Sequence, residues 1–141
     1  KILEVEQKEL NDQLNKFSRW QEFSDSVLLH ANKIKEIVFN SNSKIPAYGA
    51  SARSSTLLNF CGINSEHISV VIDKNPLKEG LYTAGSNIPI VSFQDGLDEI
   101  EKSNKILLLA WNFQDEIISE LREAGFKGQF IIPLPGDPYI L

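Results

Sequence analysis

The sequence predicts an α/β domain: a Rossmann-like parallel sheet with helices on both faces, preceded by a long N-terminal helical segment. After Lys44, apolar runs of four or five residues alternate with helical stretches. These runs are almost continuously apolar, which is typical of strands buried on both faces. Before residue 41, apolar residues recur at helical spacing. We therefore expect residues 1–40 to be a helical segment that packs on or links to the domain, and residues 41–141 to form the domain.

Within residues 1–40 the apolar spacing indicates two helices. We expect the break near Ser18, because Gln21 follows three residues later and the pair could form a capping box. Residues 1–16 carry many charges and few apolar residues. They could pack on a neighbouring domain, connect to one, or form a solvated arm.

The alternation after Lys44 predicts four strands and three helices. Cys61 is followed by Gly62, so we expect it to end the first of these helices and to pack as a small apolar group. The predicted strands cover 45–48, 68–72, 106–110 and 129–132, and the predicted helices cover 52–61, 93–102 and 113–124.

Composition excludes several classes of function. The chain has 141 residues, 42% hydrophobic and 23% charged, as expected for one globular domain. A formal net charge of −5 disfavours nucleic-acid binding, which requires a basic surface. The single cysteine and the separated His30 and His67 form no metal-ligand pattern. No apolar run approaches the roughly 20 residues of a membrane span. Because the chain begins with Lys1 rather than Met, we expect it to be a piece of a longer protein.

Unusual residues gather where the predicted strands end. Residues 49–53 follow the first strand, 73–78 the second, 111–112 the third and 133–137 the fourth. Parallel strands end at one edge of the sheet, and ligands of open α/β sheets bind there. The first turn could present helix N–H groups to a phosphate. It is a weak signal by itself, because Gly49 is the only glycine of the dinucleotide fingerprint, with Ser51 and Ser54 at the other two positions.

Two groups on the segment 73–89 allow more than one interpretation. Asp73 follows Gly49 at the distance where dinucleotide folds place an acid for the ribose hydroxyls. It could instead start a turn by accepting from the backbone two residues on. Lys74 and Lys78 could bind a phosphate, or they could be surface lysines without a ligand.

The residues after the third strand are equally ambiguous. Trp111 could stack on a base or sugar, or it could pack against a helix. Asn112, with Asp115 three residues later, could cap a helix. Ser54, Ser55 and Thr56 have no histidine and acid nearby in the sequence, so no nucleophilic triad is expected.

Three segments together resemble the C-terminal domain of the sugar C-methyltransferases. They are YGASARSSTLLN (Tyr48–Asn59), DKNPLKEGLYTAGSNIPI (Asp73–Ile90) and LLLAWNFQDEII (Leu107–Ile118). The resemblance covers about residues 14–135. Ala84 and Ala110 stand where such domains often carry proline, which affects the expected loop geometry.

The resemblance implies a three-part enzyme that transfers a methyl carbon to a nucleotide-linked keto-deoxysugar in the cytoplasm. A zinc-binding region and a domain for S-adenosylmethionine would precede this chain, which resembles the third, sugar-holding part. The chain itself is then expected to hold no cofactor, no metal and no catalytic residue, and to be inactive alone. Its expected partners are the nucleotide sugar and the upstream domain.

The resemblance and the strand ends together give the expected substrate-binding residues, which are Gly49, Ala50, Ser51, Arg53, Asp73, Asn75, Lys78, Trp111 and Asn112. Two alternatives remain open. The chain could be a stand-alone dinucleotide- or nucleotide-binding module, supported by the glycine turn and Asp73. It could also be a non-catalytic interaction domain whose N-terminal helices dock a partner.

Overall fold

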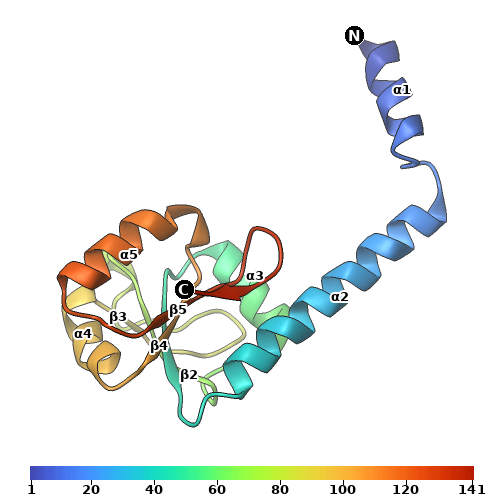
Figure 1. Ribbon diagram of the computed structural model, residues 1–141. Helices are drawn as coiled ribbons and strands as arrows, with labels where there is room; N and C mark the ends of the chain where they lie inside the picture. The colour runs from blue at the N-terminus through green and yellow to red at the C-terminus, as the bar shows by residue number, and fades with distance from the viewer.

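The computed structural model describes all residues, 1–141, and contains five α-helices and six strands (Figure 1). Two short 3-10 turns, η1 (Pro76–Lys78) and η2 (Trp111–Phe113), lie between them. In chain order the elements are α1 (Ile2–Asn11), α2 (Phe17–Phe39), β1 (Ile45–Tyr48), α3 (Ala52–Cys61), β2 (Ile68–Ile72), β3 (Ile90–Val91), α4 (Phe93–Glu101), β4 (Lys105–Leu108), α5 (Gln114–Glu123), β5 (Gln129–Ile132) and β6 (Tyr139–Ile140).

The strands form one sheet in the order β3-β2-β1-β4-β5-β6. Strands β1 to β5 pair in parallel, and β6 runs antiparallel to β5. This is the strand order of doubly wound sheets, in which the chain leaves β1 and β4 in opposite directions. The prediction of an α/β fold with a mainly parallel sheet is therefore confirmed. Strands β3 and β6 were not predicted, because two residues are too few to show an alternating pattern.

Helices cover both faces of the sheet. On one face α2 and α3 bury Ala31, Ile34, Val38 and Leu58 against strand residues such as Ile68. On the other face α4 and α5 bury side chains in a second cluster; among its members are Ile100, Ile117, Leu121 and Phe130. Figure 1 shows these two helix pairs on opposite sides of the strands. The strand ends are thus left open to solvent at the two edges, where ligands could enter.

The N-terminal region differs from the expectation. The two predicted helices are present, but they do not make one long helical segment: α1 ends at Asn11 and α2 begins at Phe17, so the break lies at residues 12–16 rather than near Ser18. The capping box predicted for Ser18 and Gln21 does not form: α2 is preceded by Lys16, and no side chain caps it. Ser18 lies inside the first turn instead. Trp20 donates its indole N–H to the carbonyl of Leu14 at 2.7 Å, which holds the chain entering the helix.

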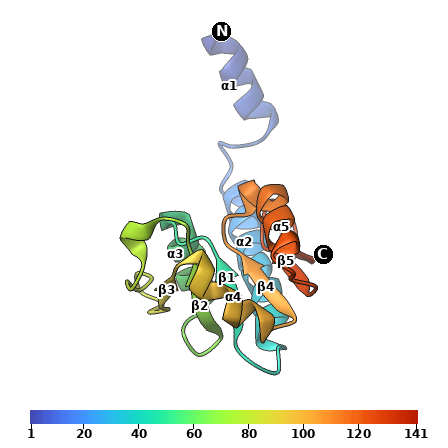
Figure 2. The same ribbon diagram turned by 90° about the vertical axis from the view of Figure 1, so that its left-hand side faces the viewer.

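Helix α1 stands away from the rest of the molecule in both ribbon views (Figures 1 and 2), and Figure 1 shows that the first half of α2 also projects from it. No residue of α1 is buried, and the buried residues of α2 begin at Ala31. None of the helices combines the length and the apolar character needed to cross a membrane.

The predicted boundaries after Lys44 are close to the observed ones, with one correction at the third predicted strand. Strand β4 ends at Leu108, and the chain then enters the turn η2, so that α5 starts at Gln114. Cys61 ends α3 as predicted, is fully buried, and is followed by Gly62 in the left-handed conformation.

Candidate functional site: the carboxyl edge of the sheet

The turn from β1 to α3 requires glycine at its first position. Gly49 has a φ of +100°, a region that favours glycine, and a Cβ there would lie 2.6 Å from the Cβ of Ala110. The turn after β1 and the segment after β4 therefore touch through their backbones. This close approach sets the geometry of the edge between the two central strands.

Helix α3 starts with a complete capping box. Ser51 accepts from the backbone N–H of Ser54, and Ser54 accepts from the backbone N–H of Ser51. The Ser54 hydroxyl also donates to the carbonyl of Gly49 at 2.7 Å. No hydrogen bond within the chain uses the N–H groups of Ala52 and Arg53. These two donors remain at the positive end of the helix dipole.

Asp73, at the end of β2, is fully engaged inside the protein. Its Oδ2 accepts from the N–H of Ala50 at 2.8 Å and from the ammonium of Lys78 at 2.9 Å, and its Oδ1 accepts from the N–H of Asn75 at 2.9 Å. Lys78 also donates to the carbonyl of Ala50 at 2.7 Å. Asp73 thus forms the turn that was one of its two interpretations, and it also fastens the segment after β2 to the segment after β1.

The charge of Asp73 is stabilised by these bonds. Burial disfavours its ionised form, but the hydrogen bonds from Lys78, Asn75 and Ala50 outweigh burial and hold the pKa of Asp73 below its usual value. The carboxylate and the ammonium of Lys78 therefore remain paired at neutral pH. Lys78 uses two of its three N–H donors in these bonds and is partly exposed, so one donor remains for a ligand.

A second group of predicted residues lies nearer the surface. The guanidinium of Arg53 lies 5.6 Å from the ring centroid of Trp111, in a cation–π arrangement, and donates to the Asn112 side chain over 3.4 Å. Asn112 does not cap α5, since Phe113 precedes that helix and no side chain caps it. Trp111 also packs against the second core cluster, but its side chain is only partly buried, so it retains some exposed surface.

A cleft of about 370 Å³ opens beside these residues. Tyr48 donates its hydroxyl to Glu120 at 3.0 Å, and Lys74 pairs with the same carboxylate at 2.7 Å. Burial and then the hydrogen bond with Glu120 raise the pKa of Tyr48 above its usual value, so the hydroxyl stays protonated. The residues that line the cleft are Tyr48, Gly49, Asp73, Lys74, Ala110, Phe113, Glu116, Ile117 and Glu120.

The structure thus separates the predicted residues into two sets. One set, around the turns after β1 and β2, comprises Gly49, Ala50, Ser51, Asp73, Asn75 and Lys78. The other set is Arg53, Trp111 and Asn112. Arg53 on α3 contacts the two residues that precede α5, and these two helices cover opposite faces of the sheet. The sequence interpretation missed Tyr48, Glu116 and Glu120. Tyr48 is the last residue of a predicted strand, which was the available signal, whereas the two glutamates look like ordinary residues of a solvated helix face.

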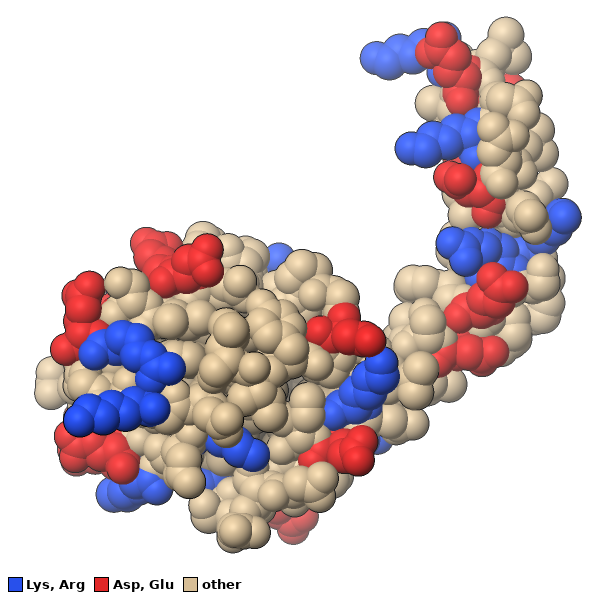
Figure 3. All heavy atoms as spheres, in the orientation of Figure 1, with Lys and Arg blue, Asp and Glu red and all other residues tan.

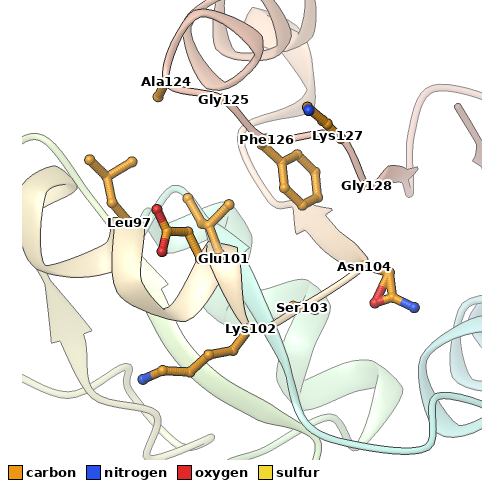
Figure 4. Close-up of a pocket in the computed structure, with 11 residues that line it drawn as sticks. Leu97, Glu101, Lys102, Ser103, Asn104, Ala124, Gly125, Phe126, Lys127 and Gly128 are labelled. Carbon is orange, nitrogen blue, oxygen red and sulfur yellow. The ribbon is translucent and has the colours of Figure 1, made fainter.

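A larger cleft, of about 500 Å³, lies at the opposite edge of the sheet (Figure 4). It is formed by the end of α4 with the turn into β4 and by the end of α5 with the turn into β5. Figure 4 shows Lys102 extending away from Phe126, and its ammonium pairs with Glu99 at 3.0 Å. This cleft contains none of the predicted site residues. In the structure, no group of three or more His, Cys, Asp or Glu side chains could hold a metal ion.

Comparison with known proteins agrees with the segments quoted above. The family model described as "C-methyltransferase C-terminal domain" matches residues 1–135. The C-methyltransferase NovU of Streptomyces niveus is 37% identical over 100 residues, which cover 69% of this chain and 23% of that relative. The match therefore spans less than a quarter of the relative's length. Because the family model covers almost the whole chain, the protein belongs to the C-methyltransferase family, as its C-terminal domain.

Proposed function

We propose that this domain binds a nucleotide-linked keto-deoxysugar for a C-methyltransferase that uses S-adenosylmethionine. The observation that supports it is the cluster of Arg53, Trp111 and Asn112 at the switch point between β1 and β4. Open α/β sheets bind ligands at that point. Membership in the C-methyltransferase family agrees with such a role.

The cluster offers groups suited to the parts of a nucleotide sugar. The guanidinium of Arg53 and the free N–H groups of Ala52 and Arg53 are donors for a diphosphate. Asn112 can donate to or accept from a hydroxyl or a base edge. The cleft next to the cluster has carboxylates and Tyr48 for sugar hydroxyls over an apolar floor that includes Ala110 and Ile117.

The other chemistry of the reaction is proposed for a different part of the enzyme. S-adenosylmethionine would supply the methyl group, and a base in the domain that binds it would remove the proton next to the sugar ketone. The residues here do not fit a methyl-donor site of the Rossmann type, since Asp73 is bonded to Ala50, Asn75 and Lys78 rather than free for a ribose. We place the methyl donor, the zinc region and the catalytic base upstream, and the reaction in the cytoplasm.

The same observation weighs against the stand-alone dinucleotide module. That function depends on a free acid after β2 and on a glycine-rich turn. Here the acid is engaged by three donors, and the turn contains a capping box of two serines. The interaction-domain alternative draws instead on the exposed N-terminal helices.

The test is the affinity for nucleotide diphosphate sugars, measured by calorimetry on the polypeptide as its gene encodes it. We expect Arg53→Ala to weaken binding about tenfold or more, on the order of 1.4 kcal/mol. The control is Lys127→Ala, which removes a cation at the opposite edge of the sheet and should leave affinity unchanged. Equal affinity of the Arg53→Ala variant and the unaltered protein would contradict the proposed function.

A further inference from the structure

Helix α2 carries one apolar stripe along its whole length, but only half of it is covered. A helix turns about 100° per residue, so residues three or four apart share a face. The stripe consists of Trp20, Phe23, Val27, Ala31, Ile34 and Val38. Its last three members are at most 4% exposed against the sheet, whereas Trp20 and Phe23 are 54% and 60% exposed.

The uncovered half projects beyond the edge that carries the candidate site. At the end of α2, Phe39 stacks on His67, just before β2, with ring centroids 4.1 Å apart. Earlier in the helix, Lys33 pairs at 2.8 Å with Asp137, which follows β5. The helix therefore passes from the amino edge to the carboxyl edge when followed backwards. Residues 17–28 overhang that edge by about 18 Å, at roughly 1.5 Å per residue.

Charge does not explain the projection. Lysine, arginine, aspartate and glutamate alternate with neutral residues over α1 and the start of α2, without a patch of one sign (Figure 3). The shared feature of the overhang is the apolar stripe. Exposed apolar surface of this kind marks an interaction site rather than a solvated arm.

We propose that Trp20, Phe23 and Val27 dock the segment of the same polypeptide that precedes Lys1. Because the overhang stands over the carboxyl edge, the docked body would lie beside the cluster of Arg53, Trp111 and Asn112 and close the site from above. The closing of the site rests on the proposed function; the docking itself does not.

Two observations favour an upstream segment as the occupant. The family description places this domain at the carboxyl end of its proteins, and the match leaves more than three quarters of the relative outside it. The chain also starts on the overhanging side: α1 follows Lys1 and leads into α2 beyond the edge of the sheet (Figures 1 and 2). A preceding segment would thus emerge next to the uncovered stripe.

Hydroxyl-radical footprinting of the encoded polypeptide tests the docking. After correction for intrinsic reactivity, we expect Trp20 and Phe23 to be labelled about tenfold more slowly than their exposure in this domain implies. Leu29 is the internal control: it is 57% exposed, and its helical position lies off the stripe. It should be labelled at the rate of a free side chain.

Two matched variants sharpen the test. Phe23→Glu should restore labelling of Trp20 and weaken nucleotide-sugar binding, whereas Leu29→Glu should do neither. Full labelling of Trp20 and Phe23 in the unaltered protein overturns the proposal. Protection that disappears on dilution, together with a dimer in sedimentation, also overturns it, since the occupant is then a second copy. Protection without any effect of Arg53→Ala on nucleotide-sugar binding contradicts the proposed function and leaves the docking in place.

Discussion

The two edges of the sheet present clefts of different kinds. The cleft at the amino edge is the larger, about 500 Å³ against 370 Å³. Its walls are the ends of two helices and the turns that follow them. At the carboxyl edge, side chains join segments far apart in the chain: Tyr48 with Glu120, and Arg53 with Asn112. Cleft size therefore does not distinguish the edge that carries the predicted residues, whereas the long-range polar contacts do.

The largest expected difference between the edges concerns glycine. Gly49 and Gly125 have similar φ values, +100° and +96°, but a Cβ at Gly49 meets Ala110, and one at Gly125 meets nothing within 4 Å. We expect Gly49→Ala to lower the free energy of unfolding by about 4 kcal/mol, from backbone strain and overpacking together. Gly125→Ala should cost only about 1 kcal/mol, from strain alone. Urea denaturation measures both, and equal costs would remove the distinction.

The next difference concerns two lysine–carboxylate pairs of similar length. Asp73 and Lys78 are 2.9 Å apart at the carboxyl edge, and Glu99 and Lys102 are 3.0 Å apart on α4 and the residue after it. Asp73→Asn should destabilise the protein by about 2 kcal/mol, because Lys78 loses its charged acceptor in a part-buried site. Glu99→Gln should cost less, because Lys102 is exposed and water screens this pair. Thermal and urea unfolding of the two variants compare them directly.

The pH dependence of stability gives a smaller, independent test. The pKa of Asp73 is lowered in the folded protein, so its contribution is present above the unfolded value of about 3.9 and is lost as pH falls through the folded value. As pH falls below about 4, the unaltered protein should lose more stability than the Asp73→Asn variant. Parallel curves over this range would show that the carboxylate is not stabilised by its partners.

The smallest difference concerns two tyrosine hydroxyls. Tyr48 is buried and donates to Glu120, while Tyr139 is partly exposed and lies 3.1 Å from the Gln114 side chain. Tyr48→Phe should cost about 1 kcal/mol, since it removes a hydrogen bond to a charged acceptor. Tyr139→Phe should leave the urea midpoint almost unchanged. A reversed order would mean that water satisfies Glu120 as well as Tyr48 does.

Local signals were enough to predict the central elements. The bounds of β1, α3, β2 and β5 coincide with the predicted ones, because Gly49, Ser51 and Gly62 mark turns and caps that depend on neighbouring residues only. The N-terminal break was misplaced for the opposite reason. The contact from Trp20 to the carbonyl of Leu14 fixes where α2 begins, and the spacing of apolar residues does not encode it.

Sequence reasoning placed the candidate residues at the carboxyl edge of the sheet, but it did not resolve their contacts. The strand order brings the turns after β1, β2 and β4 to the same edge of the sheet, as the alternation of strands and helices predicted. Which partner each side chain takes depends on contacts over long sequence distances, such as the 59 residues between Arg53 and Asn112. Asp73 shows the consequence: its spacing from Gly49 fitted a ribose acid, but Ala50 and Lys78 occupy its oxygens.

Helix α2 also bears on how this domain could be separated from its neighbours. Ala31, Ile34 and Val38 cover one face of the sheet, so a protein shortened to residues 41–141 would expose the apolar surface beneath them. Such a fragment should aggregate, although the sheet and its remaining helices would be complete in sequence. In the unshortened protein, α2 is one continuous helix from its exposed first half to the half that packs on the sheet. A movement of a partner bound to the exposed half would therefore be transmitted through the helix to the strands.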